Sequence, residues 1–154
     1  IIKDELAARC PDTVPQIFRY QTFIDNNSLF NTVPTFPVYM LCLVTRWLKA
    51  NGGLEAMHAL NQRKAAKLYN AIDATDFYSG TAIKACRSDM NVTWRIANED
   101  LESVFIEEAS KENLKTLKGH RSVGGVRASI YNAFPEAGVD ALISFMKEFE
   151  ARHG

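Results

Sequence analysis

The chain has 154 residues, of which 47% are hydrophobic and 23% charged, values that are typical of a globular protein. Its 18 lysines and arginines balance 18 aspartates and glutamates, so the formal net charge is zero. No overall electric field therefore attracts nucleic acid or an anionic membrane surface. The longest apolar run, residues 38–44, is too short to span a bilayer. We expect neither nucleic acid nor a membrane as a partner.

Short elements are predicted at the start of the chain. Residues 4–9 indicate one helical turn, and an extended loop follows because two prolines come next. Residues 17–24 are rich in aromatic and β-prone side chains, and the turn-forming pair Asn26-Asn27 follows them. This pattern predicts a strand that ends in a turn.

Two long helices are predicted next, with a pair of glycines between them. Pro34 opens the first helix, and apolar side chains recur at steps of three and four residues as far as Trp47. Gly52 and Gly53 end this helix. The second helix is predicted over residues 54–72. Its apolar stripe contains Leu54, Met57, Leu60, Leu68 and Ile72, and its other face carries Arg63, Lys64 and Lys67.

The C-terminal half predicts strands in alternation with helices. Strands are expected at residues 90–96, 114–117 and 126–131, and helices are expected to begin at Asn98 and Pro135. The fold class is therefore α+β, with a small mixed or antiparallel sheet and helices on one of its faces. The last helix has an inner stripe of Val139, Leu142, Ile143, Met146 and Phe149.

Residues 119–129, GHRSVGGVRAS, are the most informative part of the sequence. Alternation of small or apolar residues with Arg127 predicts a half-buried strand that has this arginine on its outer face. The paired glycines before the strand permit positive φ angles. An arginine held in this way can bind a carboxylate through two hydrogen bonds, and His120 and Arg121 suit a phosphate. The alternative is a solvated loop with three exposed basic residues.

A second candidate site lies at Asn31 and Thr32, just before Pro34. The N-terminus of a helix offers free N–H groups and a partial positive charge, and can therefore bind an anion. The alternative is that these two side chains only cap the long helix.

Four separated blocks of sequence resemble the phosphoserine aminotransferase family, and they occur in the order that the family has. The blocks are SLFNTVPTF at 28–36, WLKANGGL at 47–54, CRSDMNV at 86–92 and GHRSVGGVRASIYNAFPEAGV at 119–139. The resemblance implies the C-terminal part of a class V, fold type I aminotransferase that uses pyridoxal phosphate. It assigns residues 1–33 to a remnant of the large cofactor-binding domain, residues 34–53 to a long connecting helix and residues 54–154 to the small C-terminal domain.

The resemblance also implies an activity and a role for each candidate residue. Family members transfer an amino group between glutamate and 3-phosphohydroxypyruvate to give 2-oxoglutarate and phosphoserine. They serve serine biosynthesis, and some serve pyridoxine biosynthesis, as homodimers in the cytoplasm. Arg127 corresponds to the residue that binds the substrate α-carboxylate, and His120 and Arg121 correspond to residues that contact the side-chain phosphate. Asn31 and Thr32 correspond to a pair that binds the cofactor phosphate across the dimer interface.

The family's catalytic lysine, which holds the cofactor as a Schiff base, precedes the region that begins at Ile1. We therefore expect no catalytic residue in this chain and no transaminase activity from it alone. Two other functions stay open. One is a non-catalytic binding module for small phosphorylated acids, and the other is a desulfurase-like relative with a cysteine near the cofactor.

The cysteines argue against the desulfurase-like alternative, because none lies in a recognisable catalytic loop. Cys10, Cys42 and Cys86 are odd in number and widely spaced, which fits neither a zinc site nor a disulfide framework. The sequence therefore predicts no metal site, and reduced thiols of the kind found in cytoplasmic proteins.

Overall fold

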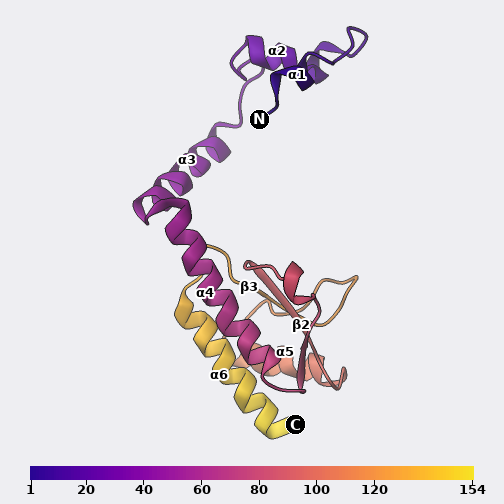
Figure 1. Cartoon of the computed structure of the whole chain (residues 1–154), viewed down its shortest axis with the longest axis vertical. Helices are drawn as coiled ribbons and strands as arrows, with labels where there is room; N and C mark the ends of the chain where they lie inside the picture. Colours follow the sequence, from indigo (N-terminus) through magenta and orange to yellow (C-terminus); the bar gives the residue numbers. More distant parts are fainter. The chain divides into compact units, whose positions relative to one another are not determined.

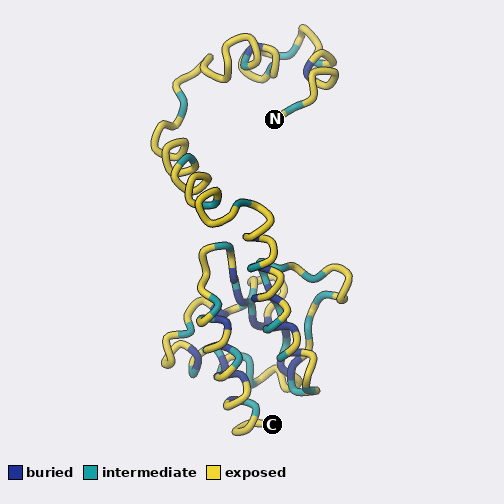
Figure 2. The backbone as a smooth tube through the Cα atoms, turned by 60° about the vertical axis from the view of Figure 1, so that its left-hand side comes forward, coloured by how far each residue is buried: buried dark blue, intermediate teal, exposed yellow.

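The computed structural model describes the whole chain, residues 1–154. Its internal contacts divide it into two compact units, Ile1–Trp47 and Leu48–Gly154. Ala7 and Thr22 are the buried residues of the first unit, and all the others belong to the second (Figure 2). The second unit is therefore the part that has a hydrophobic core.

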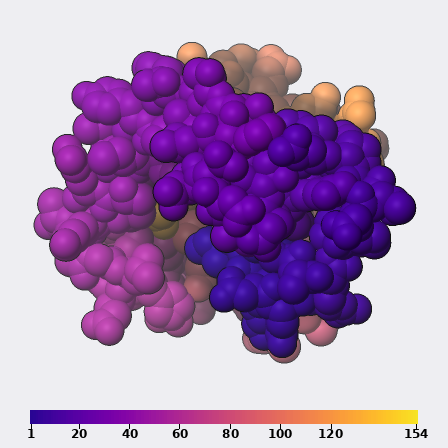
Figure 3. Space-filling model, turned by 90° about the horizontal axis from the view of Figure 1, so that it is seen from above, coloured from indigo at the N-terminus to yellow at the C-terminus, as the bar shows by residue number.

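The first unit contains helices and no strand. Its elements are α1 (Asp4–Ala7), the short 3₁₀ helix η1 (Gln16–Phe18), α2 (Tyr20–Asp25) and most of α3 (Thr35–Ala50), which continues into the second unit. The predicted long helix is confirmed, and it begins directly after Pro34. No residue of α3 is fully buried, and Figure 3 shows the surface of this unit in indigo and purple. No helix of the chain combines the length and the apolar character that crossing a membrane requires.

The strand predicted over residues 17–24 is wrong, because η1 and α2 occupy this segment. A strand needs a neighbour for its backbone hydrogen bonds, and all three strands of the protein lie in the second unit. The Arg19 guanidinium instead donates hydrogen bonds to the backbone carbonyls of Asp12 and Val14. The turn after this segment is confirmed, because Asn27 has a φ of +50°.

The second unit is an α+β fold with a three-stranded antiparallel sheet in the order β1-β2-β3. Its elements are α4 (Gly53–Asp73), β1 (Tyr78–Gly80), the 3₁₀ helix η2 (Lys84–Cys86), β2 (Asn91–Ile96), α5 (Leu101–Lys111), β3 (Val126–Ser129) and α6 (Glu136–His153). Of the two sheet types that the sequence allowed, the antiparallel one is correct.

Helices α4 and α6 lie side by side and run in the same direction (Figure 1). Ion pairs join their exposed sides. Arg63 and Lys67 of α4 pair with Glu136 at the start of α6, at 3.1 and 2.9 Å, and Lys67 also pairs with Asp140 at 2.8 Å. The matching steps of four residues on both helices fix their register.

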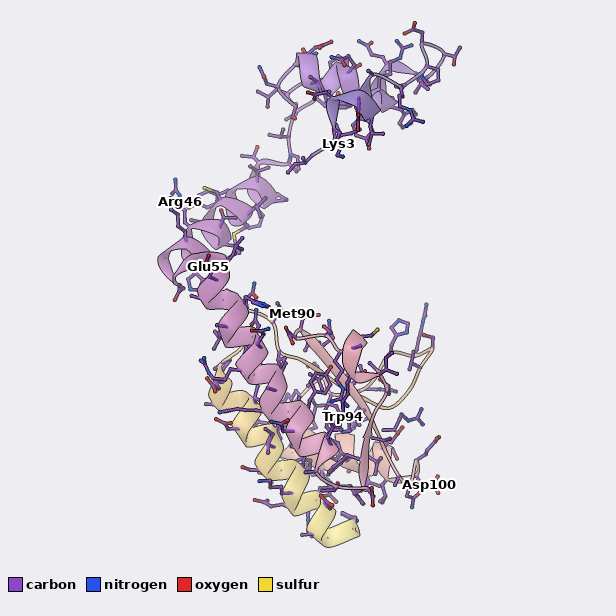
Figure 4. All side chains as sticks on the ribbon, viewed as in Figure 1. Lys3, Arg46, Glu55, Met90, Trp94 and Asp100 are labelled. Carbon is purple, nitrogen blue, oxygen red and sulfur yellow. The ribbon has the colours of Figure 1, made fainter.

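The core lies between the inner face of the sheet and the three helices α4, α5 and α6. Phe105 of α5 is at its centre and contacts Trp94 edge-on, with 6.3 Å between the ring centroids. Trp94 comes from β2 and is fully buried; Figure 4 labels it in the middle of the unit. The other rings around Phe105 are Tyr78, Phe145 and Phe149. The predicted inner stripe of α6 is confirmed, since Ile143 packs against this core and its other four members are buried in it.

Two predictions for the C-terminal half need correction. Residues 114–117 do not form a strand, because Thr116 has a φ of +63° and only one isolated bridge, Lys118 to Val126, joins this segment to the sheet. The helix expected from Asn98 begins at Leu101 instead. The Asn98 side chain accepts a hydrogen bond from the Asp100 N–H at 3.1 Å and forms a turn before the helix.

The outer face of the sheet is polar and positions the candidate site. Burial alternates along β2 and β3, so every second side chain points away from the core. The residues on this outer face are Asn91, Thr93 and Arg95 of β2 and Arg127 and Ser129 of β3.

Candidate functional site

Arg127 lies on the outer face of β3, directly opposite Thr93 of β2. Its side chain is half-buried, and its Nε atom is buried without a hydrogen-bond partner. The Thr93 hydroxyl is hydrogen-bonded to the Thr81 hydroxyl. Uncharged polar groups therefore line the sheet beside the guanidinium of Arg127.

A small hydrogen-bond network adjoins Arg127 on the same face. Ser129 and Tyr131 both donate hydrogen bonds to Asn91 Oδ1, at 3.0 and 3.3 Å. Hydrogen bonds with Ser129 and Asn91 lower the pKa of the Tyr131 hydroxyl, and the positive charge of Arg127 adds to the effect. This network contains no carboxylate that would neutralise Arg127.

The arginines of the second unit fall into two groups. Four of them form ion pairs with carboxylates: Arg63 with Glu136, Arg87 with Asp73, Arg95 with Glu99 and Glu102, and Arg152 with Glu108. The other two, Arg121 and Arg127, form none. They are the two arginines that the sequence singled out for binding substrate. A guanidinium without a carboxylate partner is available to an anionic ligand.

A loop of residues 119–125 precedes β3 and carries His120 and Arg121. The Gly119 N–H donates to the Gly125 carbonyl at 2.9 Å and closes the base of the loop. At its tip, the N–H groups of residues 123 and 124 donate to the His120 carbonyl at 2.9 and 2.8 Å. The predicted positive φ angles are confirmed at Gly124 (+74°) and Gly125 (+71°).

His120 and Arg121 lie in the loop that leads into β3, which carries Arg127, and no hydrogen bond or ion pair joins the three residues to one another. Arg127 is half-buried on the sheet, whereas His120 and Arg121 are exposed at the tip of the loop. His120 Nδ1 lies 2.6 Å from the Ser122 hydroxyl, and Arg121 makes no ion pair. The loop leads directly into β3, so the two parts of the candidate site share one continuous backbone segment.

Asn31 and Thr32 belong to the first unit and lie just before α3. Both residues are exposed, and neither side chain forms a hydrogen bond that would cap the helix; the Thr35 hydroxyl donates to the Val33 carbonyl at 3.4 Å and does not cap it either. Pro34 and Pro37 have no N–H and the Val38 N–H donates to the Pro34 carbonyl, so the free N–H groups at the start of α3 are those of Thr35 and Phe36. An amide, a hydroxyl and free N–H groups together form a donor set that fits a phosphate.

One buried side chain supports the site although its sequence pattern does not reveal it. Lys64 was placed on the outer face of its helix, but the structure buries it completely. Its ammonium donates to the carbonyls of Ile130, Tyr131 and Phe134 at 3.0, 2.8 and 3.1 Å. Lys64 therefore fixes the turn that follows β3. Its position beside two other basic residues suggested a solvated face, and no local sequence signal separated it from them.

The loop packs closely against β2 at Gly125. A Cβ atom at this position would lie 2.8 Å from the Trp94 carbonyl oxygen and 2.8 Å from Arg95 Cδ. We expect Gly125→Ala to lower the free energy of unfolding by more than the roughly 1–2 kcal/mol that a positive φ alone costs an alanine. Urea unfolding measures this difference.

Gly53→Ala is the matched control for this experiment. Gly53 has a similar φ of +74°, but nothing lies within 4 Å of its Cβ position, so that alanine meets only the cost of the backbone angle. Equal losses of stability in the two variants would contradict the close packing of the loop against β2.

Comparison with protein families gives a match over most of the chain. Residues 12–142 match the family model described as aminotransferase class-V. Among curated proteins, a phosphoserine aminotransferase of Desulfatibacillum aliphaticivorans is 51% identical over 155 residues, and one of Marinomonas sp. (strain MWYL1) is 49% identical over 154 residues. Each match covers 100% of this chain and 43% of the relative. The chain thus spans less than half the length of these relatives.

Solved structures agree with the sequence matches. A phosphoserine aminotransferase from Bacillus circulans subsp. alkalophilus has a TM-score of 0.93 at 45% identity, over 99% of this chain and 43% of that one. A phosphoserine aminotransferase with bound pyridoxal phosphate from Trichomonas vaginalis has a TM-score of 0.81 at 38% identity, over 89% of this chain and 39% of that one.

Proposed function

The chain belongs to the class-V aminotransferase family, and we propose that it forms the substrate-binding part of a phosphoserine aminotransferase. The reaction is amino transfer between glutamate and 3-phosphohydroxypyruvate, which yields 2-oxoglutarate and phosphoserine. Similarity to phosphoserine aminotransferases along the whole chain supports this proposal. Because the chain spans 43% of the length of those relatives, the remaining parts of the reaction fall to residues outside it.

The state of Arg127 is the observation that carries the proposal. Its guanidinium is half-buried, its Nε atom has no partner and no carboxylate neutralises it. A hydrogen bond to a charged group contributes about 1.5–3 kcal/mol, so a guanidinium that no carboxylate neutralises gains free energy when an anion binds. A planar carboxylate matches the guanidinium with two parallel hydrogen bonds. Every substrate of the reaction has an α-carboxylate, so one arginine can serve all four.

His120 and Arg121 are proposed to receive the second anionic group of each substrate. This group is a phosphate in phosphoserine and 3-phosphohydroxypyruvate, and a carboxylate in glutamate and 2-oxoglutarate. Arg121 has no carboxylate partner, and the exposed loop tip leaves both residues accessible. An exposed pair of basic groups can accept either anion.

Asn31 and Thr32 are proposed to hold the phosphate of pyridoxal phosphate, with support from the free N–H groups at the start of α3. When bound, this cofactor supplies the electron sink for the reaction at the substrate α-carbon. In the family, this pair serves the neighbouring subunit, so the proposal includes a homodimer. It also includes a cytoplasmic enzyme of serine biosynthesis, with pyridoxine biosynthesis as a second pathway.

An NMR titration of the chain with phosphoserine tests the proposal. We expect shifts of the signals of His120, Arg121 and Arg127 at millimolar ligand, because this chain supplies only part of the pocket. Serine is the control: it has the carboxylate but no phosphate, so it should shift the signals of Arg127 and leave the other two nearly unchanged. No shift at Arg127 would overturn its assignment, and micromolar affinity would favour a stand-alone binding module for phosphorylated acids instead.

A further inference from the structure

Arg95 of β2 makes three contacts that the assigned roles do not explain. Its Nε atom donates to Glu102 Oε1 at 2.6 Å, and its Nη2 atom pairs with Glu99 Oε2 at 2.8 Å. Its Nη1 atom donates to the carbonyl of Val123 at 3.3 Å. One guanidinium therefore joins the start of α5 to the tip of the loop formed by residues 119–125.

The backbone of this loop lies directly against the Arg95 side chain. A Cβ atom on Gly125 would come within 2.8 Å of Arg95 Cδ, and one on Gly124 would lie 3.6 Å from Arg95 Nη1. The paired glycines thus let the loop approach the arginine closely. Their sequence pattern, which suggested a turn, also serves this contact.

The bond from Arg95 to Val123 is the one hydrogen bond that reaches residues 120–124 from outside the loop. The other bonds of these residues stay within the loop: the backbone bonds to the His120 carbonyl, and the contacts of the His120 ring with Ser122. Without Arg95, the loop would be held only at its base, where its two ends are joined by the Gly119–Gly125 bond and the Arg127 N–H donates to the Leu117 carbonyl at 2.7 Å.

The charges around Arg95 allow it to lie close to other basic residues. Glu99 and Glu102 neutralise its positive charge, and the ion pair with the largely buried Glu102 raises the pKa of Arg95 above its ordinary value. Because its charge is already paired, Arg95 can fix the loop without competing with His120 and Arg121 for an anionic ligand. This separates it from Arg121 and Arg127, which have no carboxylate partner.

We infer that Arg95 is a positioning residue for the loop and determines how tightly His120 and Arg121 bind the phosphate of the substrate. This inference rests on the function proposed for these two residues. Arg95 does not touch the ligand, and its effect is selective: it acts on the phosphate end of the substrate and leaves the carboxylate site at Arg127 unchanged.

The test uses Arg95→Lys, because a lysine keeps a positive charge beside Glu102 but, as a compact point charge, cannot bond three separated partners at once. Two properties of the whole chain are measured by NMR: the backbone order of residues 119–125, and the affinity for inorganic phosphate and for acetate. Glu99→Gln is the matched control, since Glu99 is exposed and its loss leaves the bonds to Glu102 and Val123 in place.

We expect Arg95→Lys to lower the order of the loop and to weaken phosphate binding at His120 and Arg121 about two- to tenfold, the equivalent of one hydrogen bond. The affinity of Arg95→Lys for acetate at Arg127 and its unfolding midpoint should stay close to the values measured for Glu99→Gln. Unchanged loop order, or equal losses for phosphate and acetate, would overturn the inference while the proposed function stands. If the unaltered chain binds no phosphate at His120 and Arg121, the role proposed for these two residues fails instead, and the loop order still decides whether Arg95 holds the loop.

Discussion

Arg127→Lys in the proposed full-length aminotransferase is expected to retain the positive charge and still lose most of the activity. A lysine ammonium cannot form the two parallel hydrogen bonds that a guanidinium makes with a carboxylate. Hydrogen bonds to charged groups contribute about 1.5–3 kcal/mol, so kcat/KM should fall about 10- to 150-fold. Because every substrate has an α-carboxylate, the loss should be similar for glutamate and for 3-phosphohydroxypyruvate. Steady-state kinetics with both substrates measure it.

Arg152→Lys is the control for this prediction. Arg152 is an exposed arginine whose partner is Glu108 at 2.8 Å, and exposed ion pairs contribute little to stability. Its kcat/KM values should stay near those of the unaltered enzyme. Near-normal kcat/KM for both substrates in Arg127→Lys would remove Arg127 from the carboxylate site. A loss for 3-phosphohydroxypyruvate alone would instead assign it to the phosphate.

The elements that were predicted well are the ones that a long periodic pattern determines. Helix α6 buries its inner stripe because the spacing of three and four residues repeats over its whole length. In β3, the alternation of small or apolar residues with polar ones gives the face of Arg127 directly. The glycine pair also has a physical signature, since positive φ angles strongly favour glycine. For the same reason, the sequence predicted that Arg127 lies on the outer face of a strand directly after a glycine turn, as the structure has it.

The errors arose where a contact with a distant part of the chain decides the local structure. Residues 17–24 have strand-forming side chains but no neighbouring strand in their unit. Strand β1, which the sequence analysis did not predict, spans only Tyr78–Gly80 and depends on pairing with β2. Arg95 looks like any surface residue of a strand until the folded loop reaches it. Neither the composition nor the periodicity of the sequence predicts these contacts, because each contact joins residues that are far apart in sequence.

Lys64 of α4 makes a contact of this long-range kind, and it supports the candidate site from the core side of the sheet. Its buried ammonium donates to three carbonyls, at Ile130, Tyr131 and Phe134. These carbonyls lie in the turn between β3 and α6. A second bond from α4 joins the same turn, because Asn61 donates to the Asn132 side chain at 2.7 Å. Tyr131 is part of the network beside Arg127, so the clamp on this turn also orders the outer face of the sheet.

We expect Lys64→Met to lower the free energy of unfolding by about 3 kcal/mol, because methionine fills a similar volume but leaves buried carbonyls without a donor. Lys67→Met is the control: Lys67 is on the same helix, but its ion pairs are exposed, so its loss should cost less than about 1 kcal/mol. Urea unfolding followed by circular dichroism compares them, and equal losses in the two variants would show that the buried ammonium does not hold the turn.

The effect of Lys64→Met should also depend on pH. Burial lowers the pKa of the Lys64 ammonium below its ordinary value of 10.5, and the charge of Glu136 offsets part of this shift. The unfolded chain therefore binds the proton more tightly than the folded one just below pH 10.5, so this group makes the stability of the unaltered protein rise with pH in that range. Lys64→Met lacks this contribution, and the difference in stability between the two proteins should widen as the pH approaches 10.5 from below. A difference that narrows instead would mean that the folded protein holds this proton more tightly than the unfolded chain does.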